Sequence, residues 1–218
     1  MGQNTILNEK QTLILNEFKE DVRLSSTFYF TGGTALSEFY LKHRESIDLD
    51  FFSPHSFSSQ MLLEVVEGWS KKYKCTLQTQ FIDPTYNYFL NFEDGDILKI
   101  DFARYPFKSL EPHLQKDGLP VDSLFDIAVN KLLTTNQRTE VKDFVDLYFL
   151  LQEFNFWQLK DGVKAKFNIE IDPFLAASDF TKVEDFELLP KMHKALDLTT
   201  LKVFFRDQSK ALAGGSTH

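Results

Sequence analysis

The chain has 218 residues, a formal net charge of −8, 43% hydrophobic residues and 23 phenylalanines, so we expect one large or two small domains with a largely aromatic core. The negative charge excludes a global field that favours nucleic acid, and any nucleic-acid contact is therefore expected to be local. A single cysteine, Cys75, excludes an internal disulfide, and the chain shows neither a signal peptide nor an apolar run of about 18 residues, which predicts a soluble cytoplasmic protein with no membrane partner.

The first half of the chain is predicted to alternate helices and strands. The expected elements are a helix over 5–24, a strand over 28–30, a helix over 34–44, a strand over 46–52, a helix over 57–74, and strands over 75–82, 86–92 and 97–105. Asp94-Gly95 between the last two strands indicates a hairpin turn, because this pair readily adopts positive φ. Thr34, after the first strand, is expected to cap the following helix. These elements predict an α+β fold with a mixed sheet.

The second half is predicted to be helical. From Ser123 onward the apolar residues recur at helical spacing, over 124–132, 141–154 and 181–211. Pro120 is a plausible boundary between the halves. We therefore predict an α+β domain over residues 1–120, a helical domain packed on the site over 121–212, and a disordered tail over 213–218.

Gly32 and Gly33 end the first strand and open the next helix. Backbone N–H groups at such a turn can cradle a phosphate, because no Cβ blocks its approach and the helix N-terminus favours an anion. The alternative is a turn that needs glycine only for steric reasons.

Three aspartates form the candidate metal site. Asp48 and Asp50 are two residues apart in a predicted strand, so both carboxylates project from one face while Leu49 projects from the other. They repel each other in a largely buried strand unless a cation lies between them; the alternative is an exposed acidic face. An adjacent strand could add Asp101, for which a salt bridge or surface role is the alternative. Together the three predict a site for two Mg²⁺ or Mn²⁺ ions about 3.5–4 Å apart.

Two blocks of sequence resemble a known family. They are FTGGTAL at 30–36 with HRESIDLDFF at 43–52, and Asn130-Lys131 with Arg138, Lys142-Asp143 and Asp146-Leu147-Tyr148. The chain resembles the nucleotidyltransferase superfamily, and within it the AbiEii/AbiGii toxin branch, over roughly a third of its length. Lys142 stands where the branch often has Arg, which keeps the charge but loses the guanidinium fork.

The resemblance implies a β-polymerase-like catalytic core followed by a helical half. It also implies metal-dependent transfer of a nucleotide from a nucleoside triphosphate, in a bacterial toxin–antitoxin or abortive-infection system with a possible cognate antitoxin. The acceptor does not transfer with the fold.

The resemblance also assigns roles to residues outside the acidic site. Lys131 would neutralise triphosphate oxygens with help from Arg138, and Asp143 could either orient a basic residue or act as a base near the acceptor. Arg44 and Ser46 could contact phosphate or simply brace the turn. The nucleotide-binding set is thus Gly32, Gly33, Thr34, Arg44, Ser46, Lys131 and Arg138, and the catalytic set is Asp48, Asp50, Asp101 and Asp143.

Three functions are compatible with the sequence. The first is a toxin that transfers a nucleotide to RNA, suggested by the branch together with the basic residues Lys131, Arg138 and Lys142. The second is the same chemistry on a small molecule or a protein. The third is a non-catalytic nucleotide-binding module, which the intact Asp48 and Asp50 disfavour.

Overall fold

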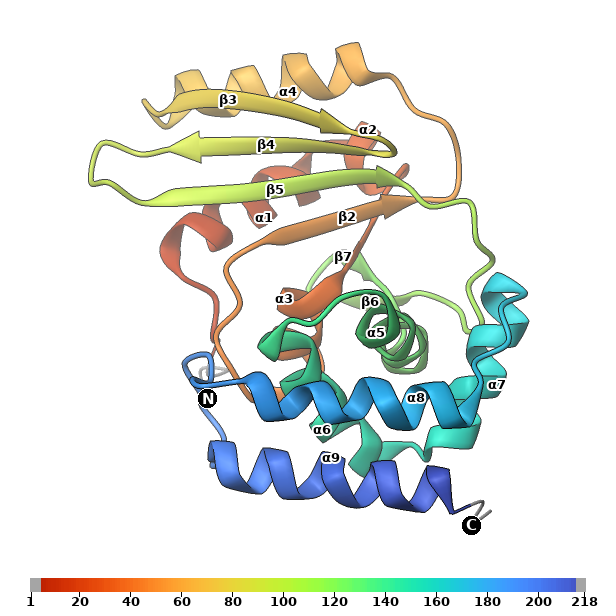
Figure 1. Ribbon diagram of the computed structural model, residues 1–218. Helices are drawn as coiled ribbons and strands as arrows, with labels where there is room; N and C mark the ends of the chain where they lie inside the picture. Colours follow the sequence, from red (N-terminus) through yellow and green to blue (C-terminus); the bar gives the residue numbers. More distant parts are fainter. Residues whose placement is uncertain (1–4, 215–218) are drawn as a thin grey trace. The chain divides into compact units, whose positions relative to one another are not determined.

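The computed structural model describes residues 5–214 in two compact units (Figure 1). Unit 1 comprises the described residues up to Lys108 together with Pro112–Ser123, and unit 2 comprises Ser109–Glu111 and the described residues from Leu124 onward. The expected boundary at residue 120 falls inside a strand of unit 1. Of the expected tail, Ala213 closes a helix and residues 215–218 lie outside the described part.

Unit 1 is an α+β unit with a mixed sheet, as predicted. Its helical elements are α1 (Glu9–Glu20), α2 (Val22–Ser25), α3 (Gly32–Leu36), a π-helical turn η1 (Ser37–Leu41) and α4 (Ser59–Lys72). Its strands are β1 (Tyr29–Thr31), β2 (Leu49–Ser53), β3 (Thr76–Ile82), β4 (Thr85–Asn91), β5 (Ile97–Arg104), β6 (Leu114–Lys116) and β7 (Leu119–Val121). The order is β3-β4-β5-β2-β1-β7-β6, with β2–β5 and β1–β7 parallel and the other pairs antiparallel.

Two neighbouring rows of residues give the sheet two chemically different faces. One row consists of register partners on β3, β4, β5, β2 and β1, namely Phe81, Tyr86, Phe102, Phe51 and Phe30. The adjacent row, one residue away on every strand, consists of Gln80, Asn87, Asp101, Asp50 and Thr31. Because successive side chains of a strand alternate between faces, the aromatic row and the polar row lie on opposite sides of the sheet.

The aromatic face forms the core of unit 1. Phe18 of α1 stacks on Phe51 with ring centroids 4.1 Å apart, and Phe51 stacks on Phe102 at 5.2 Å. Leu62, Val66 and Trp69 of α4 are also buried, and Figure 1 shows α1 and α4 running along the sheet. Leu98, Ile100 and Phe102 are buried as the alternation predicted.

Several element boundaries differ from the predictions. The helix expected over 5–24 is interrupted at Asp21, which ends α1 and whose side chain accepts from the N–H of Arg23 to cap α2. The helix expected from Thr34 begins at Gly32 instead, and it ends at Leu41 because Lys42 adopts a left-handed conformation with φ of 50°.

The second strand begins later than predicted. It starts at Leu49, so that Asp48 precedes β2 and only Asp50 of the acid pair lies within it. The short strands β6 and β7 were not predicted. They form a hairpin across Asp117-Gly118, both of which adopt positive φ, so the Asp-Gly pair was a local signal that the prediction missed. Only the pairing of β7 with β1, Phe30 with Val121, joins partners distant in sequence.

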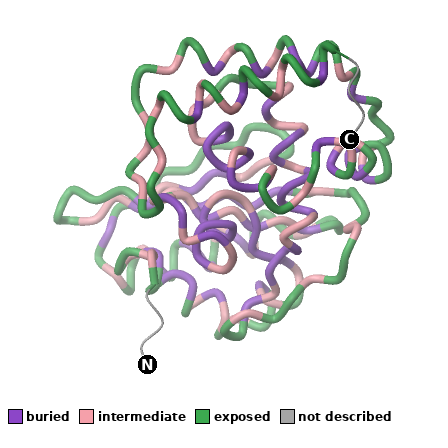
Figure 2. Tube along the Cα trace, turned by 90° about the horizontal axis from the view of Figure 1, so that it is seen from below, coloured by how far each residue is buried: buried purple, intermediate pink, exposed green. Residues whose placement is uncertain are grey.

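Unit 2 is helical, as predicted. Its elements are α5 (Leu124–Gln137), α6 (Val141–Glu153), α7 (Phe156–Phe167), α8 (Pro173–Phe180), a 3₁₀ turn η2 (Thr181–Asp185) and α9 (Leu198–Ala213). Phe144 and Phe180 each meet Phe205 edge to face at 5.1 Å, and all three are fully buried. Within each unit buried residues fill the interior while turns and outer helix faces are exposed (Figure 2).

No described helix is long and apolar enough to span a lipid bilayer.

The aromatic row generates a stability prediction. Phe51→Ala should reduce the free energy of unfolding by about 3–5 kcal/mol, because it opens a cavity between Phe18 and Phe102. Phe81→Ala, in the same row at the sheet edge, should reduce the free energy of unfolding by less than about 1 kcal/mol, because Phe81 is 56% exposed. Urea unfolding of both variants provides the measurement; equal losses would contradict this account of the core.

Candidate functional site

The polar row brings two of the predicted acids directly together. Asp50 on β2 and Asp101 on β5 are register partners in a parallel pair, so their side chains leave the same face of the sheet side by side. Asp101 is buried and Asp50 is half-buried. Asp48 lies two residues before Asp50, half-buried in the segment that leads into β2. All three acids thus lie near one end of the β2–β5 pair.

A lysine completes this acidic group. Lys99, two residues before Asp101 on β5, places its ammonium against Asp101 Oδ2 in an ion pair that is also a hydrogen bond. Burial lowers the pKa of Lys99, but the hydrogen bond to Asp101 and the negative charges of Asp101, Asp48 and Asp50 outweigh it, so its pKa lies above the ordinary value. We call Asp48, Asp50, Asp101 and Lys99 the acid–lysine cluster.

The donor set of this cluster suits a hard divalent cation. Carboxylate oxygens are the ligands that magnesium and manganese prefer, and Asp50 and Asp101 lie side by side on one face. Among the described residues, however, no three Asp, Glu, His or Cys side chains are already grouped to hold a metal ion. The cluster therefore fits a divalent cation in chemistry and side-chain direction, with Lys99 supplying the positive charge at Asp101 in this arrangement.

The glycine turn is shaped by its closeness to the acids. Gly32 has φ of +74°, and a Cβ there would lie 2.2 Å from Asp50 Oδ2 and 3.0 Å from Asp50 Cβ. A Cβ on Gly33 would lie 2.7 Å from Arg44 Nη2 and 3.0 Å from Ser46 Oγ. Gly32 is therefore required sterically, whereas a side chain on Gly33 would need Arg44 and Ser46 to shift. The close packing at Gly32 supports the simple turn and keeps the turn's backbone beside Asp50.

The remaining predicted residues of unit 1 brace this turn. Thr34 does not cap the helix as predicted; it is buried inside α3, and its hydroxyl donates to the carbonyl of Asp48 at 2.5 Å. Arg44 is buried, and its Nη1 donates to the carbonyl of Glu45 at 2.8 Å. The carbonyl of Ser46 accepts from Gln11 of α1 at 2.8 Å. Phosphate contacts by Thr34, Arg44 and Ser46 stay predictions.

Unit 2 joins Lys131, Arg138 and Asp143 of the second motif in one network built on buried acids. Lys131 on α5 lies 2.7 Å from Asp143 Oδ1 and 2.7 Å from Asp146 Oδ2 on α6. Arg138 Nε donates to Asp143 Oδ2, also at 2.7 Å. Both acids are fully buried and Lys131 nearly so. Lys142, also part of the second motif, pairs with Glu140 at 3.1 Å instead of joining this network.

Asp143 has the environment of a residue that orients basic groups. Burial raises its pKa, but the charges and hydrogen bonds of Lys131 and Arg138 outweigh it and hold the pKa of Asp143 below its ordinary value. A carboxyl with a lowered pKa is a weak base. Asp143 thus contacts both Lys131 and Arg138, and its role as an orienting group or as a base stays a prediction.

The structure brings the predicted residues together in two groups, one in each unit. Sequence reasoning missed Lys99 as a member of the first group, although its i, i+2 spacing to Asp101 on a strand was a usable signal. It also missed Thr31 and Asn87, the neighbours of Asp50 and Asp101 in the polar row, because only the register reveals them.

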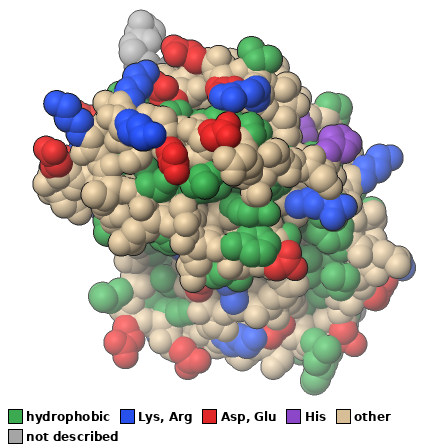
Figure 3. Space-filling model, turned by 90° about the horizontal axis from the view of Figure 1, so that it is seen from above, with side chains coloured by type: hydrophobic (Ala, Val, Ile, Leu, Met, Phe, Trp, Pro, Cys, Tyr) green, Lys and Arg blue, Asp and Glu red, His purple; other side chains and the backbone are tan. Residues whose placement is uncertain are grey.

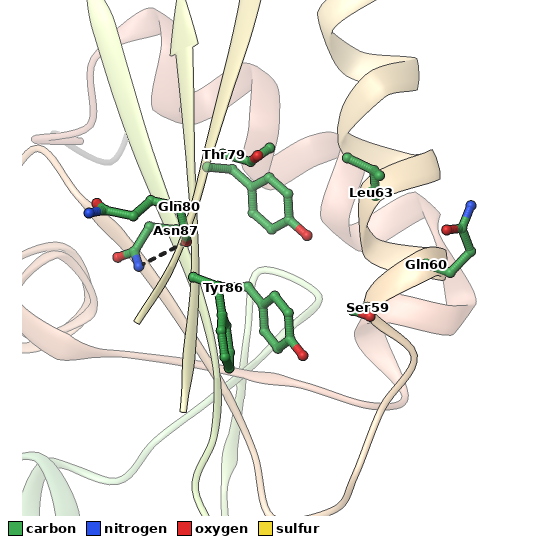
Figure 4. Close-up of a pocket in the computed structure, with 9 residues that line it drawn as sticks. Ser59, Gln60, Leu63, Thr79, Gln80, Tyr86 and Asn87 are labelled. Carbon is green, nitrogen blue, oxygen red and sulfur yellow. Dashed lines mark hydrogen bonds between the residues drawn. The ribbon is translucent and has the colours of Figure 1, made fainter. Parts of the chain in front are cut away.

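A cavity of about 200 Å³ lies apart from the acids, between α4 and the sheet edge formed by β3 and β4. Figure 4 shows Gln60 and Leu63 on the helix side, with Asn87 turned to the other face of the sheet and bonded to the carbonyl of Gln80. None of the predicted site residues lines this cavity.

Comparisons with known proteins place these groups in context. The family model described as "Nucleotidyl transferase AbiEii toxin, Type IV TA system" matches residues 14–199. A curated relative, the uncharacterised protein aq_aa25 of Aquifex aeolicus, is 31% identical over 142 residues, which span 63% of this chain and 64% of the relative's length.

Two solved structures share the fold. JHP933 from Helicobacter pylori has a TM-score of 0.60 at 22% identity, covering 96% of this chain and 94% of its own. The nucleotidyltransferase toxin MenT4 from Mycobacterium tuberculosis has a TM-score of 0.53 at 18% identity, covering 88% of this chain and 76% of its own.

The closeness of Gly32 to Asp50 can be tested with a matched pair of glycines. Gly32→Ala and Gly95→Ala both place a side chain at positive φ, which costs about 1 kcal/mol in each case. Only at Gly32 does the new Cβ meet another residue within 4 Å, whereas the surroundings of Gly95 are open. Gly32→Ala should therefore lower the free energy of unfolding by about 1–3 kcal/mol more than Gly95→Ala. Similar urea midpoints would show that Asp50 does not confine the turn.

The Asp143 network predicts a pH-dependent contribution to stability. Because the pKa of Asp143 is lowered on folding from about 3.8, its stabilisation is fully present above that pH and disappears as the pH falls through the lowered pKa. Asp143→Asn should lower the free energy of unfolding by about 2–4 kcal/mol at pH 7, since it removes the negative charge that Lys131 and Arg138 share. The gap to wild type, measured by urea unfolding, should narrow below pH 4. Asp207→Asn, at an exposed ion pair, serves as the control and should change little at either pH.

Proposed function

This chain belongs to the family of AbiEii nucleotidyltransferase toxins of type IV toxin–antitoxin systems, and from that premise we propose that it transfers a nucleotide from a nucleoside triphosphate to an RNA acceptor with the help of a divalent metal. The observation that carries the proposal is the register that sets Asp50 directly beside Asp101. The fold shared with MenT4 is consistent with this chemistry.

The acid–lysine cluster supports the metal-dependent part of the proposal. Asp48, Asp50 and Asp101 would hold magnesium or manganese, which when bound would neutralise the triphosphate and lower the pKa of the attacking hydroxyl. Gly32 brings the backbone of its turn against Asp50, where the N–H groups of the turn can face phosphate oxygens. Thr34 keeps the backbone at Asp48 in place through its hydrogen bond.

Lys131 and Arg138 are proposed to bind phosphate oxygens of the nucleotide. Asp143 accepts from both at 2.7 Å, which orients the two cations rather than leaving them flexible. Orientation in advance reduces the entropy lost on binding a ligand. Arg44 and Ser46, packed behind Gly33, are proposed to support the turn rather than to act as catalytic groups.

The acceptor is proposed to be RNA recognised through a local contact. On the side of the molecule that carries α4, lysines and arginines are interspersed with acidic residues rather than gathered in one basic patch (Figure 3). Together with the net charge of −8, this disfavours broad, sequence-independent binding to a polyanion. Recognition of a structured RNA end by a few residues is the mode that remains compatible with these charges. The cytoplasm, where RNA and nucleotides occur, is the proposed location, and the family implies an antitoxin as a genetic partner.

Label transfer tests the reaction and its acceptor together. The protein is incubated with Mg²⁺, each α-labelled nucleoside triphosphate in turn, and either total cellular RNA or a small-solute extract. We expect label in RNA, and we expect Asp50→Asn to reduce the transfer at least about 100-fold, because it removes charge where the metal and phosphates meet. Lys131→Ala should also lose the label.

Asp94→Asn, at an exposed ion pair with Lys10, is the matched control and should retain transfer. Label only in small solutes or in protein would reject the RNA acceptor, and unchanged transfer by Asp50→Asn would reject the metal site. No nucleotide consumption with any triphosphate would favour the non-catalytic module instead.

A further inference from the structure

Lys99 occupies the position within the acid–lysine cluster where a cation is needed. Register pairing sets Leu49 opposite Ile100 and Asp50 opposite Asp101, and Asp48 lies in the segment that leads into β2. Lys99 and Asp101, two residues apart on β5, leave the same face of the sheet as Asp50 on β2. The ammonium contacts Asp101, and the charges of Asp48 and Asp50 act on it as well.

This lysine is neither a solvated surface charge nor a fully buried one. Its side chain is 32% exposed and that of Asp101 is 11% exposed, so the ion pair is partly shielded from water. The ion pairs of Lys10, Lys71 and Lys72 involve helices, whereas Lys99 pairs with Asp101 along a single strand, next to the polar row.

We propose that Lys99 is the resident counter-cation of the acid–lysine cluster, and that a divalent metal ion binds Asp101 by displacing the Lys99 ammonium. The inference rests on the proposed function, since it takes the three aspartates as the metal ligands. Lys99 is accordingly a positioning residue that sets the metal affinity. It holds the carboxylates together before metal binds, and its flexible stem lets the ammonium move away while its charge stays on the same face.

The displacement has two measurable consequences. Removing the ammonium removes a competitor for Asp101, so the affinity for metal should rise. Conversely, metal binding should free the Lys99 amine from its ion pair and make it more reactive toward an acylating reagent. A lysine that serves only to stabilise the fold would show neither response.

The first experiment measures Mn²⁺ binding by titration calorimetry, without nucleotide or acceptor. Lys99→Met should bind Mn²⁺ about three- to tenfold more tightly than wild type, since a partly buried ion pair no longer opposes binding. Lys99→Arg keeps the charge and should remain near wild type. Lys71→Met is the matched control, because the Lys71 side chain is 81% exposed and its ion pair with Glu67 on α4 is long, at 3.9 Å. This variant should bind Mn²⁺ as wild type does.

The second experiment uses the unmodified protein and therefore does not depend on a variant folding. Acylation of lysine amines is followed residue by residue by mass spectrometry, with and without saturating Mn²⁺. Modification of Lys99 should increase several-fold when Mn²⁺ is present, while modification of Lys71 should stay constant.

The two hypotheses fail in distinguishable ways. If wild type binds Mn²⁺ and Asp50→Asn abolishes this binding, the proposed metal site stands. Unchanged or weaker binding by a folded Lys99→Met protein, or Lys99 acylation that does not rise with Mn²⁺, then overturns the displacement alone. A wild-type protein that binds no Mn²⁺ overturns both.

Discussion

Two carboxylates placed side by side on neighbouring strands repel each other, and the site depends on how this repulsion is compensated. Asp50 and Asp101 are direct register partners, a pairing that destabilises a sheet unless positive charge is supplied. Lys99 supplies it in this structure through its contact with Asp101. The repulsion is thus compensated locally, and under the proposed displacement a cation of higher charge would take the place of Lys99.

The same constraint explains why the surrounding residues are small or tightly bonded. Gly32 leaves room for the Asp50 carboxylate, and Thr34 holds the backbone of Asp48 by a short hydrogen bond. On the opposite face, aromatic rings of Phe51 and Phe102 stack against each other and fix β2 beside β5. The core therefore sets the register, and the register sets the separation of the acids.

In unit 2, the buried acids of α6 are compensated by basic side chains. Lys131 pairs with the buried Asp143 and Asp146, the half-exposed Arg138 pairs with Asp143, and the formal charges of these four side chains sum to zero. Burying charge is tolerable only when every group is paired with good geometry, as the 2.7 Å contacts show here. A network of this kind holds its cations in defined positions, which suits phosphate recognition better than a flexible surface lysine does.

The sequence alone determined the α+β and helical halves, most strands, the glycine turn and the family, because these depend on local period, turn chemistry and short motifs. The alternation around Ile100 also placed Asp101 on the face opposite the core, since successive side chains of a strand point to opposite sides. Tertiary structure alone decided that Asp50 faces Asp101, that Asp48 precedes its strand, and that Thr34 braces rather than caps. The physical reason is that strand register joins residues tens of positions apart, such as Asp50 and Asp101, so partners across strands are selected by packing of the whole core and not by local sequence.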